Sequence, residues 1–464
     1  MSEKMKEKNF VQGEKYKLEL SNSSMHEGIF VFENNEFIYL KLNSGYNMGI
    51  LKKNIKSCVN MDLEDKSHLL KESSSKLHAN SHKSFFDSSN IISENTQFDK
   101  DSEIIILHTG GTIASKVDYS TGAVNAKFTP SEMISLFPEL KDIAKIDSKL
   151  ISNMPSDDLN FYHYNEMAKA IELALALKSI KGIILTQGTD TVHYTSSALS
   201  FMFENLPIPI VIVGAQRSSD RPSSDSALNL LSAAYFISKS KENNTNGVFI
   251  CMHESSSDDS CVILPAHNVR KLHSTRRDAF KVISGGIFAK VNFENKSINF
   301  LHNNMQYEPA TIKNKILKLF DPSIKVGIIR SRPGLLPEEL KIYEKFDGLI
   351  LEGTGLGHFP IDQFDESTKQ NKEILKIIEE IASKKVACMT SQTVFGRINL
   401  NVYSPGRTLK DLGVLGHNLN MTTETAYIKL VWLLSNYSLD DTKKLYSKNL
   451  RGEILDRLEN EDFL

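Results

Sequence analysis

The chain is poor in the features that mark an oxidising compartment, a zinc site or a membrane. Its four cysteines, Cys58, Cys251, Cys261 and Cys388, are scattered without a Cys-x-x-Cys pair. This spacing argues against a disulfide or zinc framework and favours free thiols in a reducing compartment. No run of 18 apolar residues is present, so we expect no transmembrane helix. The opening Met-Ser-Glu-Lys-Met-Lys-Glu-Lys lacks the apolar segment of a signal peptide, and we expect a cytoplasmic protein.

The chain also lacks an excess of positive charge. Its 55 Lys and Arg against 57 Asp and Glu leave a formal net charge of -2. The chain as a whole therefore cannot neutralise many phosphates, and any work on nucleic acid would need a local basic patch or a partner. The composition, 40% hydrophobic and 24% charged, is that of an ordinary globular protein. The length predicts roughly three domains.

Several common catalytic and binding motifs are missing as well. The sequence has no Gly-x-x-x-x-Gly-Lys-Ser/Thr loop, no Gly-x-Gly-x-x-Gly turn, no His-Glu-x-x-His and no Gly-x-Ser-x-Gly. None of its 13 histidines has the spacing of metal ligands. We therefore expect neither a metal nor a nucleotide cofactor in this chain. The pair Asp258-Asp259 favours a solvated loop over an acid–base dyad.

What is present begins with a small all-β unit, to which we assign residues 1–62. Two turn signals, Asn34-Asn35 and Asn43-Ser44-Gly45, separate short segments rich in β-branched and aromatic residues. The predicted strands are Tyr16–Leu20, Glu27–Glu33, Glu36–Leu42, Tyr46–Lys52 and Ile55–Met61. Short strands at this spacing indicate a small barrel, a fold that more often binds or positions something than catalyses.

The next segment, residues 63–100, changes character. It is rich in Ser, Asn, Lys and His and contains few apolar residues. Such a composition cannot bury enough surface to offset the entropy of ordering it, so it predicts a flexible linker. A short helix near Leu63–Lys71 is compatible with the pattern.

From Asp101 onward, apolar strand patterns alternate with helical ones, which predicts an α/β fold with a largely parallel, doubly wound sheet. We divide this part into a first domain at 101–305 and a second at 306–464. The first has predicted strands at Ile104–His108, Gly182–Thr186, Pro209–Gly214 and Val248–Met252, and helices at Ser131–Phe137, Tyr162–Lys178, Val192–Glu204 and Asp225–Ser238. The second has predicted strands at Lys325–Arg330, Gly348–Leu351 and Val386–Thr390, and helices at Pro337–Phe346, Glu366–Ser383, Thr422–Leu434 and Leu439–Ser447.

Two hydroxyl-bearing turns follow predicted strands of the first domain. One is Thr109-Gly110-Gly111-Thr112, and the other is Gly188-Thr189-Asp190-Thr191. Because chemistry in open α/β sheets gathers at the carboxyl ends of the strands, both turns are expected at one cleft. A threonine hydroxyl needs a neighbour to take its proton, and a buried Lys271 near Asp190 could do this. Taken singly, each turn is more typical of a capped helix start.

A third polar segment, Gly214–Asp225, also follows a buried strand. It is compatible with a helix start capped by Ser224 or Asp225. Its density of polar groups at a strand end is equally compatible with a wall of the active site.

Taken together and in this order, the two threonine turns and Lys271 resemble the L-asparaginase/glutaminase family from about Ile104 to about Trp432. The resemblance implies an amidohydrolase with two domains of that family's fold. Its catalytic residues would be Thr112, Thr189, Asp190 and Lys271. Tyr119 would assist the first threonine. Ser156 and Asp158, in Ser156-Asp157-Asp158, match the element that binds the amino-acid head group, and Gly188 is a candidate oxyanion contact.

A closer resemblance, covering nearly the whole chain, is to the D subunits of archaeal glutamyl-tRNA(Gln) amidotransferases, a branch of this family. It rests on the barrel, with His26-Glu27-Gly28-Ile29, on Ala215–Asp225, and on Arg276-Arg277-Asp278-Ala279-Phe280 after Lys271. It implies a glutaminase whose ammonia passes to the E subunit of such enzymes, where ATP and Mg would serve amidation of Glu-tRNA(Gln). It also implies a homodimer of this chain within a heterotetramer, away from any membrane.

Two other functions stay open at this point. One is a free-standing L-asparaginase, and the other is a non-catalytic scaffold on the same fold. Gln187 stands where the family pattern leads us to expect histidine, and His108 precedes the first motif. Neither position removes one of the expected catalytic groups.

Overall fold

A computed structural model describes residues 10–11, 14–33, 36–42, 47–61, 97–111, 113, 115–117, 124–126, 137–218, 223–301 and 315–457. Most of the predicted linker, the helix predicted at Leu63–Lys71 and nearly all of that at Ser131–Phe137 lie outside these ranges. So do the two turn signals of the all-β unit. None of the helices in these ranges combines the length and the hydropathy that a membrane-spanning segment requires.

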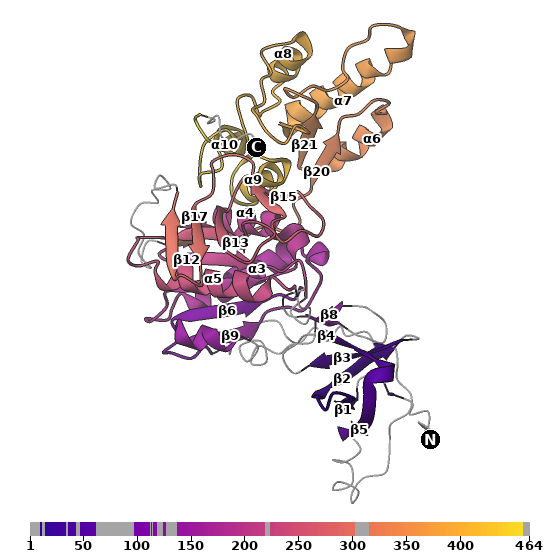
Figure 1. Ribbon diagram of the computed structural model, residues 1–464. Helices are drawn as coiled ribbons and strands as arrows, with labels where there is room; N and C mark the ends of the chain where they lie inside the picture. Colours follow the sequence, from indigo (N-terminus) through magenta and orange to yellow (C-terminus); the bar gives the residue numbers. More distant parts are fainter. Residues whose placement is uncertain are drawn as a thin grey trace, which may run out of the picture.

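The N-terminal unit is an antiparallel five-stranded sheet in the order β4-β3-β2-β1-β5 (Figure 1). Its strands are β1 (Lys15–Leu20), β2 (Met25–Glu33), β3 (Phe37–Leu42), β4 (Asn47–Leu51) and β5 (Ile55–Asn60). A single 3-10 turn at Lys52–Asn54 joins the last two. Side chains from all five strands fill one core, among them Leu18, Phe30 and Leu40. The sheet therefore curls around its own interior, but β4 and β5 form no ladder with each other over the described residues.

The first α/β domain is built on an eight-stranded mixed sheet in the order β18-β17-β14-β13-β12-β10-β6-β9. Five neighbours run parallel: β9 (Ile146–Leu150), β6 (Ile104–His108), β10 (Gly182–Thr186), β12 (Pro209–Val213) and β13 (Gly247–His253). Three antiparallel strands extend it: β14 (Cys261–Pro265), β17 (Ala289–Asn292) and β18 (Ser297–Phe300). The α/β fold is confirmed, and the sheet is mixed rather than purely parallel.

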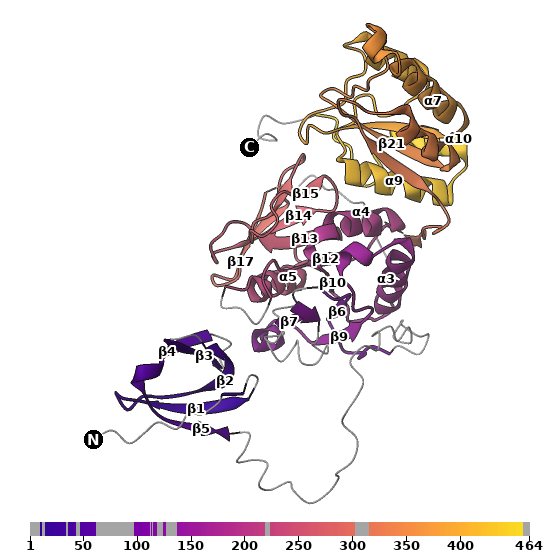
Figure 2. The same cartoon turned by 90° about the vertical axis from the view of Figure 1, so that its right-hand side faces the viewer.

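Helices cover both faces of this sheet, because its central strands are apolar on both sides. Helices α3 (Phe161–Ala174) and α4 (Val192–Met202) pack on the face that carries Ile105 and Ile183. Helix α5 (Ser226–Ser238) packs on the opposite face, with Ile106 and Ile184. Figure 2 shows α3 and α5 on opposite sides of the strands. This alternation is what the continuous apolar runs of the sequence predict for a doubly wound sheet.

Three short ladders complete this part of the molecule. They are β7 (Ser115–Val117) with β8 (Val124–Ala126), β11 (Phe203–Glu204) with β19 (Ile316–Leu317), and β15 (Val269–Lys271) with β16 (Phe280–Val282). The last of these, the β15–β16 hairpin, carries Lys271.

The C-terminal domain has a parallel three-stranded sheet of β20 (Val326–Arg330), β21 (Gly348–Gly353) and β22 (Val386–Ser391). Its helices are α6 (Pro337–Lys341), α7 (Asn371–Lys384), α8 (Ser404–Asp411), α9 (Thr423–Asn436) and α10 (Leu439–Tyr446). The predictions at Pro337–Phe346 and Glu366–Ser383 were too long as α-helices, because 3-10 turns occupy Ile342–Lys345 and Glu366–Thr368. Helix α9 packs on α4, and the rings of Phe201 and Trp432 stack 5.7 Å apart. One apolar core therefore extends through both domains.

Candidate active site

The two threonine turns come together because their strands are neighbours. Strands β6 and β10 pair in parallel, with His108 opposite Thr186, so both chains leave the sheet at the same edge. The first residue of the first turn is bonded to β10, because both the amide and the hydroxyl of Thr109 donate to the carbonyl oxygen of Thr186, at 3.0 and 2.9 Å. The sequence-based expectation that the turns share one end of the sheet agrees with this register.

Two glycines let the turns approach more closely than other residues could. Gly110 and Gly111 have φ angles of 106° and 85°, a region that L side chains rarely adopt. A Cβ on Gly111 would lie 2.3 Å from the amide nitrogen of Gly188, and one on Gly110 would lie 2.7 Å from that of Met154. The first motif is thus packed directly on the backbone of the second. Thr112 and Tyr119 themselves lie outside the described residues.

Thr189 lies in a 3-10 turn, Thr189–Thr191, that leads into α4. It is buried, with 6% of its surface exposed. Lys271 donates from Nζ to the Thr189 hydroxyl oxygen at 2.8 Å and to the Asp190 carboxylate at 2.8 Å. The Lys271 side chain is only 10% exposed, whereas that of Asp190 is 62% exposed. The structure therefore brings together three of the four residues expected to be catalytic, with the carboxylate on the solvent side.

Lys271 owes its position to the β15–β16 hairpin, in which it pairs with Phe280. The residue at the base of the hairpin, Asn268, has a φ of 55° and is held by the C-terminal domain. Its amide donates to the Thr425 hydroxyl at 3.2 Å, and its side chain donates to the Glu453 carbonyl at 2.9 Å. The lysine is therefore placed by contacts from both domains.

The residues expected to bind the substrate's head group lie next to these. Ser156 is buried in a 3-10 turn, Ser156–Asp158, and its hydroxyl lies 3.0 Å from where a Cβ of Gly188 would be. Its carbonyl accepts a hydrogen bond from the Thr191 hydroxyl at 2.9 Å. Asp158 occupies the same turn but is exposed. Ser156 and Gly188 are thus adjacent to Thr189, and Asp158 stands further toward solvent.

Two more residues lie at this site: Gly214, which begins the polar segment expected either to cap a helix or to line the site, and His193, which was not singled out from the sequence. Gly214, at the end of β12, lies against Thr189, since a Cβ there would be 2.6 Å from the threonine methyl carbon. His193 is buried in the first turn of α4, and its Nδ1 has no hydrogen-bond partner among the described residues. Burial, with added repulsion from Arg270 and Lys271, lowers the pKa of His193 to about 4. It is therefore neutral near pH 7 and adds no charge beside Lys271.

The structure contradicts one of the two predictions for the segment after Gly214, capping by Asp225, whereas a wall of the active site stays a prediction. Asp225 stands at the N-cap position of α5 but makes no capping bond to that helix. Its carboxylate instead accepts from the amides of Gln216 and Arg217 at 3.0–3.1 Å. The capping interpretation is wrong for Asp225, which instead fixes the loop leaving β12.

Chemically, this arrangement provides a hydroxyl, an amine and a carboxylate within hydrogen-bonding distance of one another. An amine so placed can move a proton to or from the hydroxyl, and the carboxylate stabilises the charge that results. Over the described part of the chain, no three His, Cys, Asp or Glu side chains are grouped so as to hold a metal ion.

Comparison with known proteins agrees with the motifs and the fold. Residues 103–306 match the model "Asparaginase, N-terminal", and residues 325–445 match "Glutaminase/Asparaginase C-terminal domain". The solved L-asparaginase from Thermococcus kodakarensis is 30% identical, with a TM-score of 0.65 over 76% of this chain and 100% of that one. L-asparaginase I from Vibrio cholerae, 24% identical with a TM-score of 0.63, shares the fold.

Relatives that match over nearly the full length are named as D subunits of glutamyl-tRNA(Gln) amidotransferase. The protein from Methanococcus maripaludis (strain C7) is 39% identical over 449 residues, covering 95% of this chain and 97% of the relative. That from Sulfolobus acidocaldarius is 38% identical, covering 91% of this chain and 86% of the relative. Both matches extend well beyond the 103–306 and 325–445 segments. The chain therefore belongs to the asparaginase family of amidohydrolases, in the group of the glutamyl-tRNA(Gln) amidotransferase D subunits.

Proposed function

We propose that this chain hydrolyses the side-chain amide of glutamine to glutamate and ammonia, as the glutaminase component of a tRNA-dependent amidotransferase. The observation that carries the proposal is the 2.8 Å contact of Lys271 Nζ with both Thr189 and Asp190. The near full-length relatives named as D subunits support this role over that of a scaffold without activity.

In the proposed mechanism, the Thr112 hydroxyl oxygen attacks the amide carbon, and Tyr119 helps to remove its proton. The C–N bond then breaks, the nitrogen leaves as ammonia with that proton, and an acyl ester remains on the threonine. Water adds to the ester, and glutamate is released. Thr189, Lys271 and Asp190 form the second catalytic group, which activates a hydroxyl or a water molecule.

Binding of the amino-acid head group is assigned to Ser156 and Asp190, with Asp158 as a more distant contributor. Backbone N–H groups at Gly188 and Thr189 would stabilise the oxyanion that forms when the amide carbon is attacked. This half-reaction requires no metal or nucleotide in this chain.

The ammonia is proposed to pass to the E subunit of the amidotransferase, which would use ATP and Mg to activate Glu-tRNA(Gln) and form the amide. In that setting the whole complex is an ATP-dependent carbon–nitrogen ligase. We further propose a homodimer of this chain within a heterotetramer. The balanced charge of this chain fits such a division of labour, because the partner would supply most of the contacts to tRNA.

The β1–β5 sheet is assigned to docking of the partner protein or the tRNA. Deletion of residues 1–62 should then weaken complex formation or tRNA-dependent turnover, while the α/β domains keep their fold. Unchanged assembly and unchanged turnover would contradict this assignment.

The function is tested by measuring ammonia release from glutamine and from asparagine, with and without the E subunit and Glu-tRNA(Gln). Strong stimulation of glutamine hydrolysis by the partner and tRNA is expected. Equal, fast hydrolysis of asparagine with and without them would instead indicate a free-standing L-asparaginase, the activity named for the Thermococcus kodakarensis structure. No hydrolysis under any condition would indicate a scaffold.

A further inference from the structure

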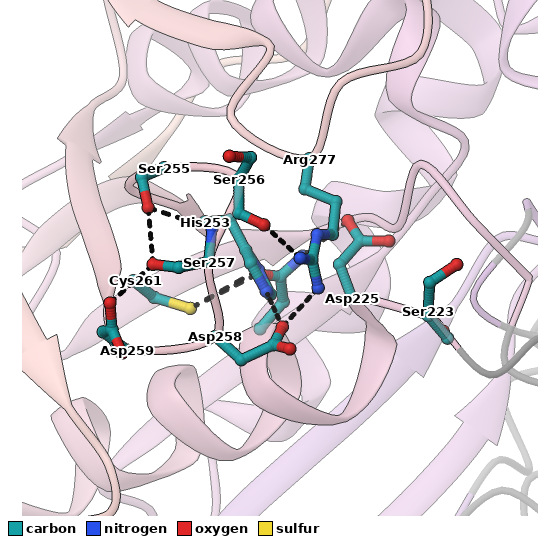
Figure 3. Close-up of polar contacts among 12 residues, drawn as sticks. Ser223, Asp225, His253, Ser255, Ser256, Ser257, Asp258, Asp259, Cys261 and Arg277 are labelled. Carbon is teal, nitrogen blue, oxygen red and sulfur yellow. Dashed lines mark hydrogen bonds and ion pairs between the residues drawn. The ribbon is translucent and has the colours of Figure 1, made fainter.

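Two polar segments that the proposed mechanism does not use are joined to each other by a network of polar contacts, which is largely buried except at Asp258, whose side chain is 70% exposed. One is the loop after β12, which contains Gln216 and Arg217, and the other is the tip of the β15–β16 hairpin, which contains Arg277. Figure 3 shows the His253 ring, Asp258 and Arg277 in one line of contacts, with Asp225 beside them. One end of the network reaches Thr189 through Gly214, and the other end reaches the hairpin that carries Lys271.

The first part of the network orients an asparagine. Asp225 is fully buried and holds the loop amides, as described above. Asn229, one turn later on α5 and also fully buried, donates from Nδ2 to the Asp225 carboxylate at 3.2 Å and to the carbonyl of Gly214 at 3.0 Å. With both donors engaged in this way, the side-chain oxygen of Asn229 can only accept.

That oxygen determines the protonation of His253. Nδ1 of the ring lies 2.6 Å from Asn229 Oδ1, and Nε2 lies 3.2 Å from Asp258 Oδ1. Both neighbours are acceptors when Asp258 is ionised, so the ring is best satisfied as an imidazolium. Burial alone would lower the pKa of His253, but Cys261, Asp258 and Asp225 together raise it. Two further titratable or charged groups adjoin them in the described residues: Cys251, hydrogen-bonded to Cys261, and Arg277, bound to Asp258.

The last part of the network reaches the catalytic hairpin. Arg277 donates to the Asp258 carboxylate and to the carbonyl oxygen of Ser256, both in the turn between β13 and β14. The Arg277 side chain is 15% exposed, so it is largely packed in place. Its neighbour Arg276 does not take part, because it pairs with Asp278 through two bonds of 2.8 Å.

The two ends of the network meet at the site itself. Gly214, whose carbonyl is held by Asn229, lies against the Thr189 methyl group. Arg277 fixes the tip of the hairpin that presents Lys271, and Lys271 Nζ contacts Thr189 Oγ1. One end of this series of contacts therefore packs against Thr189, and the other end holds the hairpin of Lys271.

We propose that Arg277 is a positioning residue that, through Asp258, His253 and Asn229, holds the Lys271 hairpin in register with Thr189, and so couples the position of Gln216 and Arg217 to amide hydrolysis. The expected effect on kcat rests on the proposed function, whereas the placement of the Lys271 hairpin by Arg277 does not. A partner that shifts Gln216 and Arg217 would alter the contact between Lys271 and Thr189 without binding to either residue.

The test compares Arg277→Gln with the matched control Arg276→Gln, next to it in the same loop, in the assembled complex with glutamine as substrate. Arg277→Gln is expected to lower kcat by about 10- to 100-fold, because small displacements of catalytic groups have effects of that size. KM should change by less than about twofold, since the head-group contacts are elsewhere. Arg277→Lys should recover part of kcat by reaching Asp258 alone. Arg276→Gln should retain the wild-type kcat.

Equal kcat values for Arg277→Gln and Arg276→Gln would overturn the proposal, as would a rise in KM alone. If Arg277→Gln fails to fold, Asp258→Asn tests the same link, with the same expected loss of kcat and the same contradicting result. If the wild-type protein hydrolyses no amide, the proposed function fails. The positioning role is then decided by crystal structures. Loss of the Lys271–Thr189 hydrogen bond in Arg277→Gln would support it, and an unchanged contact would refute it.

Discussion

Lys271 Nζ lies 2.8 Å from the hydroxyl oxygen of Thr189, although 82 residues separate the two in the chain. The threonine is carried by a turn at the end of a central parallel strand, and the lysine by a separate two-stranded hairpin. Their contact therefore depends on packing between elements that neither local pattern specifies.

The close approach of the two threonine turns is tested by Gly111→Ala. A methyl group there would meet the amide of Gly188 at 2.3 Å, in addition to the strain of a positive φ. The strain alone costs about 1–2 kcal/mol. The matched control is Gly413→Ala, since Gly413 has a φ of 93° and nothing within 4 Å of the added carbon.

Both variants should lose similar stability from strain, but only Gly111→Ala should lose glutamine hydrolysis as well. Thermal unfolding midpoints and ammonia release, measured on both variants, check this. Full activity in Gly111→Ala would show that the turns need not touch for catalysis.

The assigned nucleophile is tested by Thr112→Val, which removes the hydroxyl and keeps the shape. In the reconstituted complex, amidation from glutamine should fall by at least about 10³-fold, as expected when an acylated nucleophile is lost. Amidation from added ammonium should be unchanged. The control is Thr109→Val in the same motif, whose hydroxyl donates to the Thr186 carbonyl.

Thr109→Val should lose some stability while most glutamine-dependent amidation remains. If Thr112→Val still forms the amide from glutamine at the wild-type rate, another group must attack the substrate.

A buried ion pair between Lys429 on α9 and Glu453 near the C-terminus is expected to hold the C-terminal segment in place. Both side chains are fully buried. The two pKa shifts point to opposite conclusions about the pair. The pKa of Glu453 is lowered, because the charge of Lys429 outweighs burial, and this favours the ionised carboxylate. The pKa of Lys429 is lowered as well, because burial outweighs the charge of Glu453, and this favours the neutral amine. We favour the ionised pair, because the Leu450 and Arg451 amides also donate to Glu453 and Lys429 donates to the Lys448 carbonyl.

Glu453→Gln leaves Lys429 buried without its counter-charge, which should cost about 3–5 kcal/mol. The double variant Lys429→Met/Glu453→Gln should be less destabilised than the sum of the two single changes. Urea unfolding followed by the fluorescence of Trp432, the single tryptophan, measures these differences. Additive effects of the two changes would contradict an ionised pair.

A pH dependence of stability is expected from His267, which is buried between Ser197 and Ser200 on α4. Burial lowers the pKa of His267 from 6.5 to about 4. The unfolded chain therefore takes up a proton at higher pH than the fold does. The stabilising effect is complete above pH 6.5 and is lost as the pH falls from 6.5 to 4, by up to about 3 kcal/mol.

His267→Gln should make the unfolding midpoint less dependent on pH in this window, as read by Trp432 fluorescence. His273→Gln, which removes an exposed histidine, should follow the wild-type curve. Identical curves for wild type and His267→Gln would mean that His267 is not neutral in the fold.

Much of the architecture could be predicted because the strands are strongly patterned. Ile104–His108, Gly182–Thr186 and Pro209–Val213 are continuous apolar runs, and a strand buried on both faces produces such runs. The antiparallel strands β14 and β17 were not foreseen. The first, Cys261–Pro265, is a continuous apolar run like the predicted strands and was missed, whereas the second, Ala289–Asn292, alternates over only four residues, too few to establish a period. Helix α8 was missed because Ser404-Pro405-Gly406 at its start is typical of a turn.

At the site, motif order identified Thr189, Asp190 and Lys271, but not what holds them. Capping by Asp225, one of the alternatives for its segment, was wrong: an aspartate before a helix favours capping, and only tertiary contact shows it holding the preceding loop. The support of Lys271 by Asn268 could not be seen either, because it links residues more than 150 positions apart. The residues that form the site could be predicted from the sequence, whereas the distant residues that hold them in place could not.

We propose that Lys271, through Thr189 and Asp190, serves glutamine hydrolysis and not the amidation step. It is tested most directly by comparing glutamine-dependent and ammonium-dependent amidation of Glu-tRNA(Gln) by complexes containing wild-type chain or Lys271→Leu. We expect Lys271→Leu to lose glutamine-dependent amidation and to keep the wild-type rate with ammonium. Wild-type rates with glutamine would contradict it.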